Sequence, residues 1–337
     1  MVKYLGIDIG GTKCALVTAD EEGRILCKER FATEDYESTL RRIIDTAREL
    51  IAGEKPSAIG ISCGGPLDAR RGMILSPPNL PGWDEVPITR IMTDELGIPA
   101  YLCNDANACA LAEHEFGAGR GCDDMIFLTF GTGMGAGIIS GGRLLDGACG
   151  NAGECGHMRL SPDGPWGFGK DGSFEGWCSG GGIVKLARFL AKCTENSYVP
   201  SYMLDEYESR ELLNSYEKTA PAWIRDTDLS TARICELADA GDTFARTVIR
   251  ISARKLGQAL SILIDVINPE KIVIGSVFTR REDMFREEME KAIAADAIPA
   301  SAAVCSVVPA SLGESLGDYA AIAVARVGER RKDGLSL

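Results

Sequence analysis

Two glycine-rich turns carry residue types that could hold a chain of phosphate groups. The first is Asp8–Lys13, with the sequence Asp-Ile-Gly-Gly-Thr-Lys, and the second is Gly131–Gly135, with the sequence Gly-Thr-Gly-Met-Gly. Glycines allow close backbone approach, and a hydroxyl and an amine beside a carboxylate could cradle a polyphosphate with Mg²⁺. An ordinary hairpin turn explains either segment alone. Two such turns in equivalent places favour a nucleotide held by both.

The first turn is predicted to lie in an α/β sheet. The spacing of apolar and β-forming residues predicts two strands, a helix, a further strand and a short helix: Val2–Ile9, 14–19, Tyr36–Ile51, Ser57–Cys63 and Ala106–Phe116. Because strand, helix and strand alternate, an α/β sheet is expected.

A second cycle of the same pattern begins at Met125. An apolar strand, a Gly/Thr turn and another apolar strand over 125–139 repeat the arrangement of the first nineteen residues. A long amphipathic helix over Phe244–Val266 then leads into a strand over Lys271–Ile274. The repeat predicts that the two halves arose by duplication.

Length, charge and cysteine usage limit the classes of function. The chain has 337 residues and a formal charge of −13, with 45% apolar and 25% charged residues. This length predicts two domains, and the composition excludes a disordered or collagen-like chain. The acidic balance disfavours nonspecific binding to nucleic acid or an anionic membrane. Twelve scattered cysteines without a Cys-x-x-Cys spacing favour reduced thiols in a cytoplasmic protein.

Together these motifs resemble those of the ROK family of bacterial sugar kinases and sugar-responsive repressors. The resemblance runs from residue 3 to about residue 325. It is carried by six motifs, in order: Asp8–Lys13, Pro78–Trp83, Asn104–Ala108, the turn over 129–137, Gly150–His157 and Leu316–Ala320.

The resemblance implies an α/β chain with the duplicated actin-like fold, also called hexokinase-like or ribonuclease H-like, in which two lobes lie around a central cleft. We expect an N-terminal lobe over 1–120, a larger C-terminal lobe over 121–337 and a hinge near 117–124. The C-terminal helix is expected to return to the N-terminal lobe.

The resemblance also implies roles in phosphoryl transfer. An N-cap explains an isolated Asp105 at a helix start, but its match to the family's catalytic base favours a carboxylate that accepts the proton of a sugar hydroxyl. Asp8 is expected to position Mg²⁺ through water. Ser276 stands where a second glycine is expected at the adenosine site. The residues expected to bind ATP are Gly10, Gly11, Thr12, Lys13, Thr132, Gly133 and Gly275.

Carboxylate, imidazole and amide side chains can replace the water around vicinal sugar hydroxyls. By resemblance, the residues expected to bind the sugar are Asn79, Asn104, Glu154, His157, Glu175 and Gly65. The chain has only two histidines, and the second, His114, is predicted to be an exposed helix residue.

The sequence departs from the family at zinc. Many members follow Gly-His with three cysteines that close a tetrahedral site with the histidine, but the matching positions here are Trp166, Phe168 and Ser173. We therefore predict no structural zinc. We expect apolar burial of an aromatic cluster to hold the loop instead: Trp166, Phe168, Phe174 and Trp177. An alternative metal set has a spacing that matches no common zinc pattern: Cys149, Cys155, His157 and Cys178.

The leading hypothesis is a cytoplasmic, homodimeric, ATP- and Mg²⁺-dependent kinase for the 6-hydroxyl of glucose or an N-acyl hexosamine. Fructose, mannose and allose are alternative substrates. A sugar-sensing repressor of the same family is a competing class, but only seven residues precede Asp8, too few for a helix-turn-helix domain. Asp8 and Asp105 also disfavour a catalytically silent sugar-binding protein.

Overall fold

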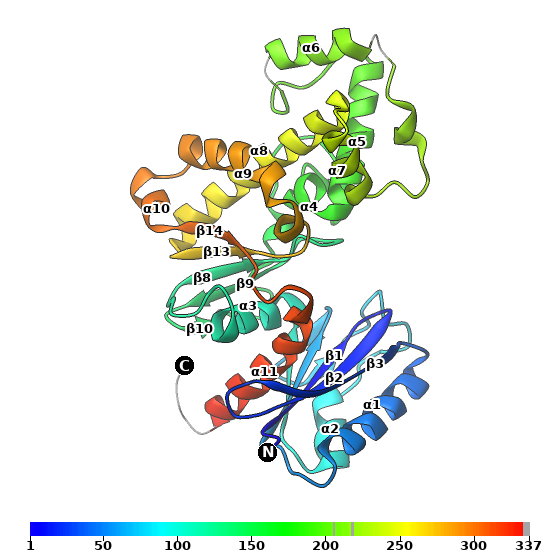
Figure 1. Ribbon diagram of the computed structural model, residues 1–337, viewed down its shortest axis with the longest axis vertical. Helices are drawn as coiled ribbons and strands as arrows, with labels where there is room; N and C mark the ends of the chain where they lie inside the picture. Colours follow the sequence, from blue (N-terminus) through cyan, green and yellow to red (C-terminus); the bar gives the residue numbers. More distant parts are fainter. Residues whose placement is uncertain (205, 217–218, 333–337) are drawn as a thin grey trace. The chain divides into compact units, whose positions relative to one another are not determined.

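The computed structural model describes residues 1–204, 206–216 and 219–332, which include two five-stranded sheets (Figure 1). The first sheet has the order β3-β2-β1-β4-β7. Its strand β1 pairs antiparallel with β2 and parallel with β4, which in turn pairs parallel with β7. The bounds in chain order are β1 (Tyr4–Ile9), β2 (Lys13–Ala19), β3 (Ile25–Ala32), β4 (Ala58–Cys63) and β7 (Ala100–Asn104).

The second sheet repeats this order in the second half of the chain. Its order is β10-β9-β8-β13-β14, so each of its strands has a counterpart at the same place in the first sheet. The bounds are β8 (Met125–Leu128), β9 (Ala136–Ser140), β10 (Arg143–Leu144), β13 (Lys271–Ile274) and β14 (Ser306–Pro309). The repeated order confirms the predicted duplication.

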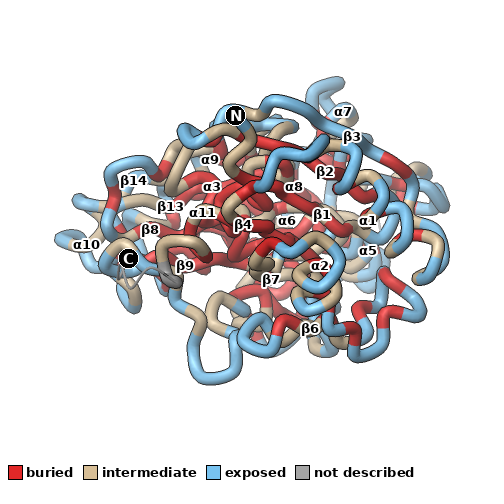
Figure 2. Tube along the Cα trace, turned by 90° about the horizontal axis from the view of Figure 1, so that it is seen from below, coloured by how far each residue is buried: buried red, intermediate tan, exposed pale blue. Residues whose placement is uncertain are grey.

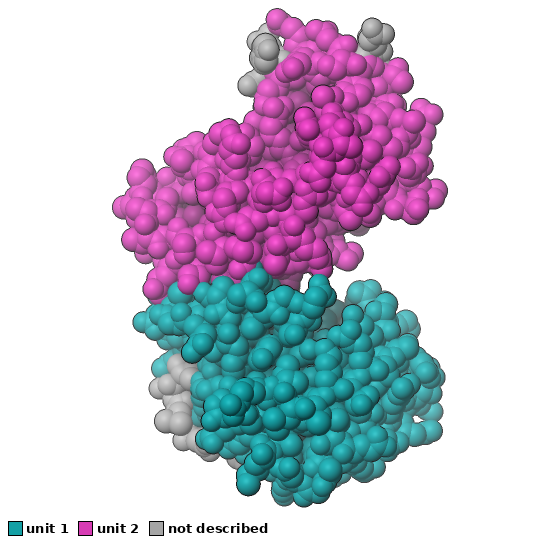
Figure 3. Space-filling view, viewed as in Figure 1, with its two compact units in different colours: residues 1–127, 136–153, 310–337 teal, residues 128–135, 154–309 magenta. Residues whose placement is uncertain are grey.

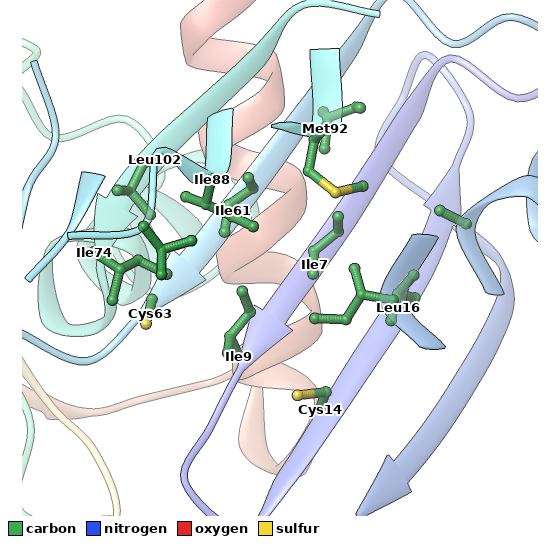
Figure 4. Packing of buried hydrophobic residues seen from close by; sticks show 14 of the residues in the cluster. Ile7, Ile9, Cys14, Leu16, Ile61, Cys63, Ile74, Ile88, Met92 and Leu102 are labelled. Atoms are coloured by element: carbon green, nitrogen blue, oxygen red, sulfur yellow. The ribbon is translucent and has the colours of Figure 1, made fainter. Parts of the chain in front are cut away.

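Helices cover both faces of the first sheet. Its helices are α1 (Tyr36–Ile51), α2 (Ile88–Leu96), α3 (Asp105–Phe116) and α11 (Leu316–Lys332). Helix α1 has the predicted bounds, because the Asp35 side chain accepts a hydrogen bond from the Ser38 amide at its start and Ala52 adopts a left-handed conformation at its end. Figure 4 shows the apolar core on the face of the sheet that α2 covers, where Ile7, Leu16 and Ile61 of the strands meet side chains of α2.

Strands β1 and β4 are almost wholly buried (Figure 2), because α11 packs against their opposite face. Glycine makes this approach possible. A Cβ atom at Gly60 would overlap the Ala321 carbonyl oxygen and the Ala325 amide, and one at Gly6 would lie 2.9 Å from the Ala321 Cβ. The close fit fixes where the first turn of α11 lies relative to the end of β1.

The other helices surround α8 (Thr243–Ile267), which contacts α4, α5, α7 and α9. The Asp242 side chain caps its start and Asn268 is left-handed at its end. The sequence predicted this helix to within one residue at each end. The remaining helices are α4 (Phe174–Cys178), α5 (Gly180–Glu195), α6 (Glu206–Tyr216), α7 (Thr231–Asp239), α9 (Val277–Asp296) and α10 (Pro299–Val304).

Short two-residue strands complete the fold. They form two hairpins, β5 (Leu67–Asp68) with β6 (Met73–Ile74), and β11 (Trp166–Gly167) with β12 (Lys170–Asp171). Among the described residues no helix is both long and apolar enough to cross a membrane. All twelve cysteines are free thiols.

The chain divides into two compact units (Figure 3). Unit 1 comprises residues 1–127, 136–153 and 310–337, and unit 2 comprises residues 128–135 and 154–309. Helix α11 belongs to unit 1, where it contacts β1, β4 and α3. The division into lobes at residue 120 stays a prediction.

The close packing of α11 yields a stability prediction. Substitution Gly60→Ala forces the Cβ atom into the α11 backbone, which cannot rotate away as a side chain would. We expect a loss of about 1–3 kcal/mol in the free energy of unfolding, measured by urea titration. Ile59→Val, a neighbouring buried substitution that only removes a methyl group, is the comparison and should cost about 1 kcal/mol. A Gly60→Ala protein as stable as wild type would contradict the packing.

Candidate active site

In unit 1, the ends of three neighbouring strands bring two aspartates together. Asp8 of β1 lies opposite Ser62 of β4, and the end of β4 lies opposite Asn104, the last residue of β7. Asp105 follows directly as the first residue of α3. The sheet register therefore gathers residues that lie about a hundred positions apart in the sequence.

Asp105 is held at the helix start but remains open to solvent. The Asn104 side chain caps α3 by accepting a hydrogen bond from the Ala106 amide at 3.0 Å, and Asp105 Oδ1 accepts from the same amide at 2.8 Å. Many protein atoms crowd the carboxyl group, and this desolvation raises its pKa, although the hydrogen bonds from Ala106 and Asn104 oppose the rise. The residue is nevertheless exposed. A reactant could therefore reach this carboxylate.

The pKa of Asp8 is also raised. Burial and the charge of Asp105 raise its pKa from 3.8 to about 6, while a hydrogen bond from Ser62 and the charge of Lys13 favour the ionised form. A third carboxylate, Asp318 of α11, adds to the repulsion, but it forms an ion pair with Lys28. Sequence reasoning placed Asp318 in a family motif and gave it no role. Three carboxylates therefore concentrate negative charge near the end of β1.

Two neighbouring loops of unit 1 also contact these residues. A Cβ atom at Gly64 would lie 3.9 Å from Asp105 Oδ2, and one at Gly65 would lie 3.5 Å from Asn104 Nδ2. The first glycine turn also meets Asn79, because a Cβ atom at Gly11 would lie 2.5 Å from the Asn79 carbonyl oxygen. Four of the expected site residues thus lie at two contacts: Gly11 with Asn79, and Gly65 with Asn104.

The first turn itself is a tight hairpin with exposed side chains. The Gly10 amide donates to the Lys13 carbonyl at 3.1 Å, and the Thr33 hydroxyl donates to the Gly10 carbonyl at 2.6 Å. Thr12 and Lys13 are exposed. Their hydroxyl and ammonium groups are therefore free to meet an anionic ligand.

In unit 2, the second turn is fixed by Glu175 and by the start of α5. Glu175 Oε2 accepts a hydrogen bond from the Met134 amide at 3.1 Å, and a Cβ atom at Gly133 would lie 3.0 Å from the same oxygen. The Gly181 amide donates to the Thr132 carbonyl at 3.2 Å. The structure thus brings Thr132, Gly133 and Glu175 together.

The sequence Glu154–His157 packs against the same turn. Residues 155–157 form one turn of 3-10 helix, and the His157 amide donates to the Glu154 carbonyl at 3.2 Å. A Cβ atom at Gly156 would overlap the Met134 carbonyl oxygen, so only glycine permits this approach. Glu175 and Gly156, the residue next to His157, therefore both contact the backbone of Met134.

The expected adenosine turn lies beside the second glycine turn. The Gly275 amide donates to the Leu128 carbonyl at 2.9 Å, and Ser276 Oγ lies 3.6 Å from where a Cβ atom of Gly131 would be. Ser276 has φ 58° and ψ −111°, a conformation that favours glycine. The position therefore keeps the backbone of the expected glycine although it carries a side chain.

The positions expected for zinc ligands in the family do not fit a metal. Ser173 is buried and caps α4, because its Oγ accepts from the Gly176 amide at 3.1 Å and donates to the Gly167 carbonyl at 2.9 Å. No group of three or more His, Cys, Asp or Glu within the described ranges could hold a metal ion. The alternative set is therefore not assembled: Cys149, Cys155, His157 and Cys178.

Two details of the sequence interpretation are wrong. Phe174 and Trp177 are buried as expected, but Trp166 and Phe168 are 56% and 54% exposed, because they belong to the β11–β12 hairpin, Trp166 in strand β11 and Phe168 in its turn. His114 is not exposed either. It is half-buried, and its Nε2 lies 2.9 Å from the Cys122 carbonyl oxygen.

Comparison with known proteins defines the class. The model of the ROK family matches residues 4–327. The chain is 30% identical over 327 residues to a glucokinase of Thermotoga maritima, covering 96% of this chain and 97% of that protein. It is also 30% identical over 298 residues to a xylose repressor of Caldicellulosiruptor bescii, covering 86% of this chain and 69% of the repressor.

Solved structures agree with this result. A ROK hexokinase of Thermus thermophilus superposes with a TM-score of 0.77 at 30% identity, covering 98% of this chain and 99% of that one. A ROK glucokinase of Streptomyces griseus, solved with glucose and AMPPNP, gives a TM-score of 0.70 at 32% identity, covering 97% and 100%. The protein has the duplicated actin-like fold, as predicted. The chain belongs to the ROK family.

The raised pKa of Asp8 yields a prediction on stability. Because the folded protein binds the Asp8 proton more tightly than the unfolded chain, Asp8 contributes most favourably below pH 4, and this contribution is lost as the pH rises to about 6. At pH 8 we expect Asp8→Asn to raise the free energy of unfolding by about 1–3 kcal/mol, measured by urea titration. The difference should shrink below pH 4.

The matched control is Asp94→Asn, which alters an exposed carboxylate of α2. It should leave the stability within about 0.5 kcal/mol of wild type at both pH values. Lower stability of Asp8→Asn at pH 8 would contradict the electrostatic account of this site.

Proposed function

We propose that this protein is an ATP-dependent sugar kinase that phosphorylates a hexose or N-acyl hexosamine, with the 6-hydroxyl of glucose as the leading acceptor. The glucokinases among its relatives and the glucose and AMPPNP bound by the Streptomyces griseus protein support this proposal. The observation that carries it is the accessible carboxylate of Asp105 at the start of α3, a helix capped by Asn104, with a second carboxylate, Asp8, beside it.

In this proposal Asp105 is the general base. A sugar hydroxyl is a weak nucleophile, and a carboxylate within hydrogen-bond reach accepts its proton as the new O–P bond forms. The raised pKa of Asp105 makes it a stronger base than an ordinary aspartate. The amide of Ala106 holds one carboxyl oxygen, which leaves the other oxygen to face the acceptor.

The two glycine turns are assigned to the nucleotide. Thr12 and Lys13 are exposed and carry donor groups suited to phosphate oxygens, and Thr132 and Gly133 supply backbone of the second turn. Gly275 is assigned to adenosine. Magnesium, when bound with ATP, neutralises phosphate charge and aligns the transferred group. The carboxylate of Asp8 fits an outer position around a hydrated Mg²⁺, since mutual repulsion with Asp105 is relieved by a cation.

Sugar recognition is assigned to the residues that the family resemblance implies, which the structure describes within each unit separately. Asn79, Asn104 and Gly65 belong to unit 1, and Glu154, His157 and Glu175 belong to unit 2. Fixed acceptors and donors are needed to replace the water around hydroxyls. Glu175 already holds the Met134 amide with one oxygen, so its other oxygen is the one assigned to a sugar hydroxyl.

The direct test is ADP release over a panel of glucose, mannose, fructose, allose, N-acetylglucosamine and N-acetylmannosamine. For the sugar used best, Asp105→Asn should lower kcat by about 10²–10⁴-fold, because the amide cannot accept the proton. Sugar affinity, measured by calorimetry, should change little. Asp94→Asn, a surface aspartate variant, should retain wild-type turnover. An active Asp105→Asn enzyme would refute the assigned base. Tight sugar binding without turnover in the wild type would instead favour a regulatory protein.

The pH dependence follows from the same carboxylates. Both Asp8 and Asp105 are assigned roles as ionised groups, and burial raises the pKa of each. We therefore expect kcat/KM, which reports the ionisation of the free enzyme, to fall as the pH drops through about 6, well above the ordinary aspartate value of 3.8. Initial rates at low concentrations of sugar and ATP between pH 4 and 9 provide the measurement. An acid limb near pH 4 would contradict the assignment.

A further inference from the structure

The β11–β12 hairpin presents an aromatic ring to a residue of the proposed sugar site. The Phe168 ring packs against the His157 imidazole in an edge arrangement, with ring centroids 3.9 Å apart and ring planes at 61°. Phe168 stands at a position where the family resemblance places a zinc-binding cysteine. A carbon ring cannot bind the metal, so this position does not fit the zinc site found in many members of the family.

Phe168 has a backbone conformation that is unfavourable for a bulky residue. Phe168 and Gly169 form a two-residue hairpin turn in which both residues have positive φ, 51° and 80°. Such a turn favours Asn-Gly, and a bulky residue at its first central position is strained. Strain of this kind persists where the surrounding structure holds it, and it is concentrated at functional sites. The turn therefore keeps an unfavourable residue whose ring contacts His157.

Hydrogen bonds on both sides of the turn fix the hairpin that carries the Phe168 ring. The buried Ser173 hydroxyl donates to the Gly167 carbonyl at 2.9 Å on one side of the turn. On the other side, the Lys170 ammonium donates to the His157 carbonyl at 2.7 Å. The hairpin therefore contacts His157 in two ways, by a hydrogen bond to its backbone carbonyl and by ring packing.

We propose that Phe168 is a positioning residue that orients the His157 imidazole toward the sugar hydroxyls, in a protein that contains no structural zinc. This inference rests on the proposed sugar kinase function. The Phe168 ring restricts rotation of the imidazole by direct packing, and the hydrogen bonds on both sides of the turn hold the ring in place. Trp166 lies in the same hairpin and is equally exposed, but its ring faces the Lys185 ammonium at 5.0 Å. Trp166 has no part in this role.

The test separates orientation from folding. Phe168→Asn installs the residue that the turn prefers and removes the ring, so its thermal unfolding midpoint should equal or exceed that of wild type. Its KM and calorimetric Kd for the hexose used best should rise about tenfold, with kcat within about twofold of wild type. Phe168→Tyr should keep wild-type affinity because it retains the ring. Trp166→Ala is the matched control and should bind the hexose as wild type does.

Nuclear magnetic resonance gives a readout independent of activity. The chain contains two histidines, so tag-free protein labelled with ¹³C at histidine should give two imidazole signals, assigned with His114→Gln. Because an aromatic ring shifts the resonances of atoms packed against it, Phe168→Asn should move the His157 signal and leave the His114 signal in place. Phe168→Tyr should keep the His157 signal near its wild-type position.

The outcomes separate the two proposals. Stoichiometric zinc in the purified protein, measured by elemental analysis, would overturn the zinc-free site. A Phe168→Asn protein with wild-type KM, or an unmoved His157 signal, would reject the role of Phe168 alone. A wild-type protein that neither binds nor phosphorylates any hexose of the panel would reject the proposed function, and with it the role given to His157.

Discussion

The site in unit 1 depends on the repulsion between two carboxylates that the fold holds close together. Asp8 and Asp105 repel each other in crowded surroundings, and the pKa of each is raised. The first sheet sets their separation, since Asp8 lies at the end of β1 and Asp105 begins the helix that follows β7. The positive end of the α3 dipole and the Ala106 amide partly compensate Asp105. The folded protein thus keeps a concentration of negative charge that a cation and a proton-donating hydroxyl would relieve. A chain selected for stability alone would replace one of the carboxylates with an amide.

Much of this arrangement could be predicted from the sequence, because its signals are local. The bounds of α1 follow from an apolar stripe and from Asp35 as its cap, and those of α8 follow from a similar stripe and Asp242. The repeated strand, turn and strand predicted a duplication, and the two sheets have the same strand order. The nearness of Asp8 and Asp105 follows from the same topology, because parallel strands end at one edge of the sheet and place the residues after them together.

The remaining details depend on packing that no local pattern encodes. Four aromatic residues close together in the sequence predicted one buried cluster, yet the hairpin separates them, with Phe174 and Trp177 inside and Trp166 and Phe168 outside. The direction of a hairpin tip depends on its anchor, here Ser173 at the start of α4. The contact between His114 and Cys122 likewise joins a helix to a loop that follows it. No local pattern in the sequence indicates which surface covers each of these side chains.

Glu175 shows how the parts of unit 2 act together. Its carboxylate accepts the Met134 amide, so the side chain cannot turn freely while the second glycine turn keeps its shape. The segment that carries Glu154 and His157 packs on the carbonyl of the same Met134, through a glycine that no larger residue could replace. The proposed phosphate turn and the proposed sugar residues of unit 2 are therefore built on one residue's backbone. Any change in the shape of this turn would have to break or move the hydrogen bond from the Met134 amide to Glu175, because Glu175 is bonded to the turn itself.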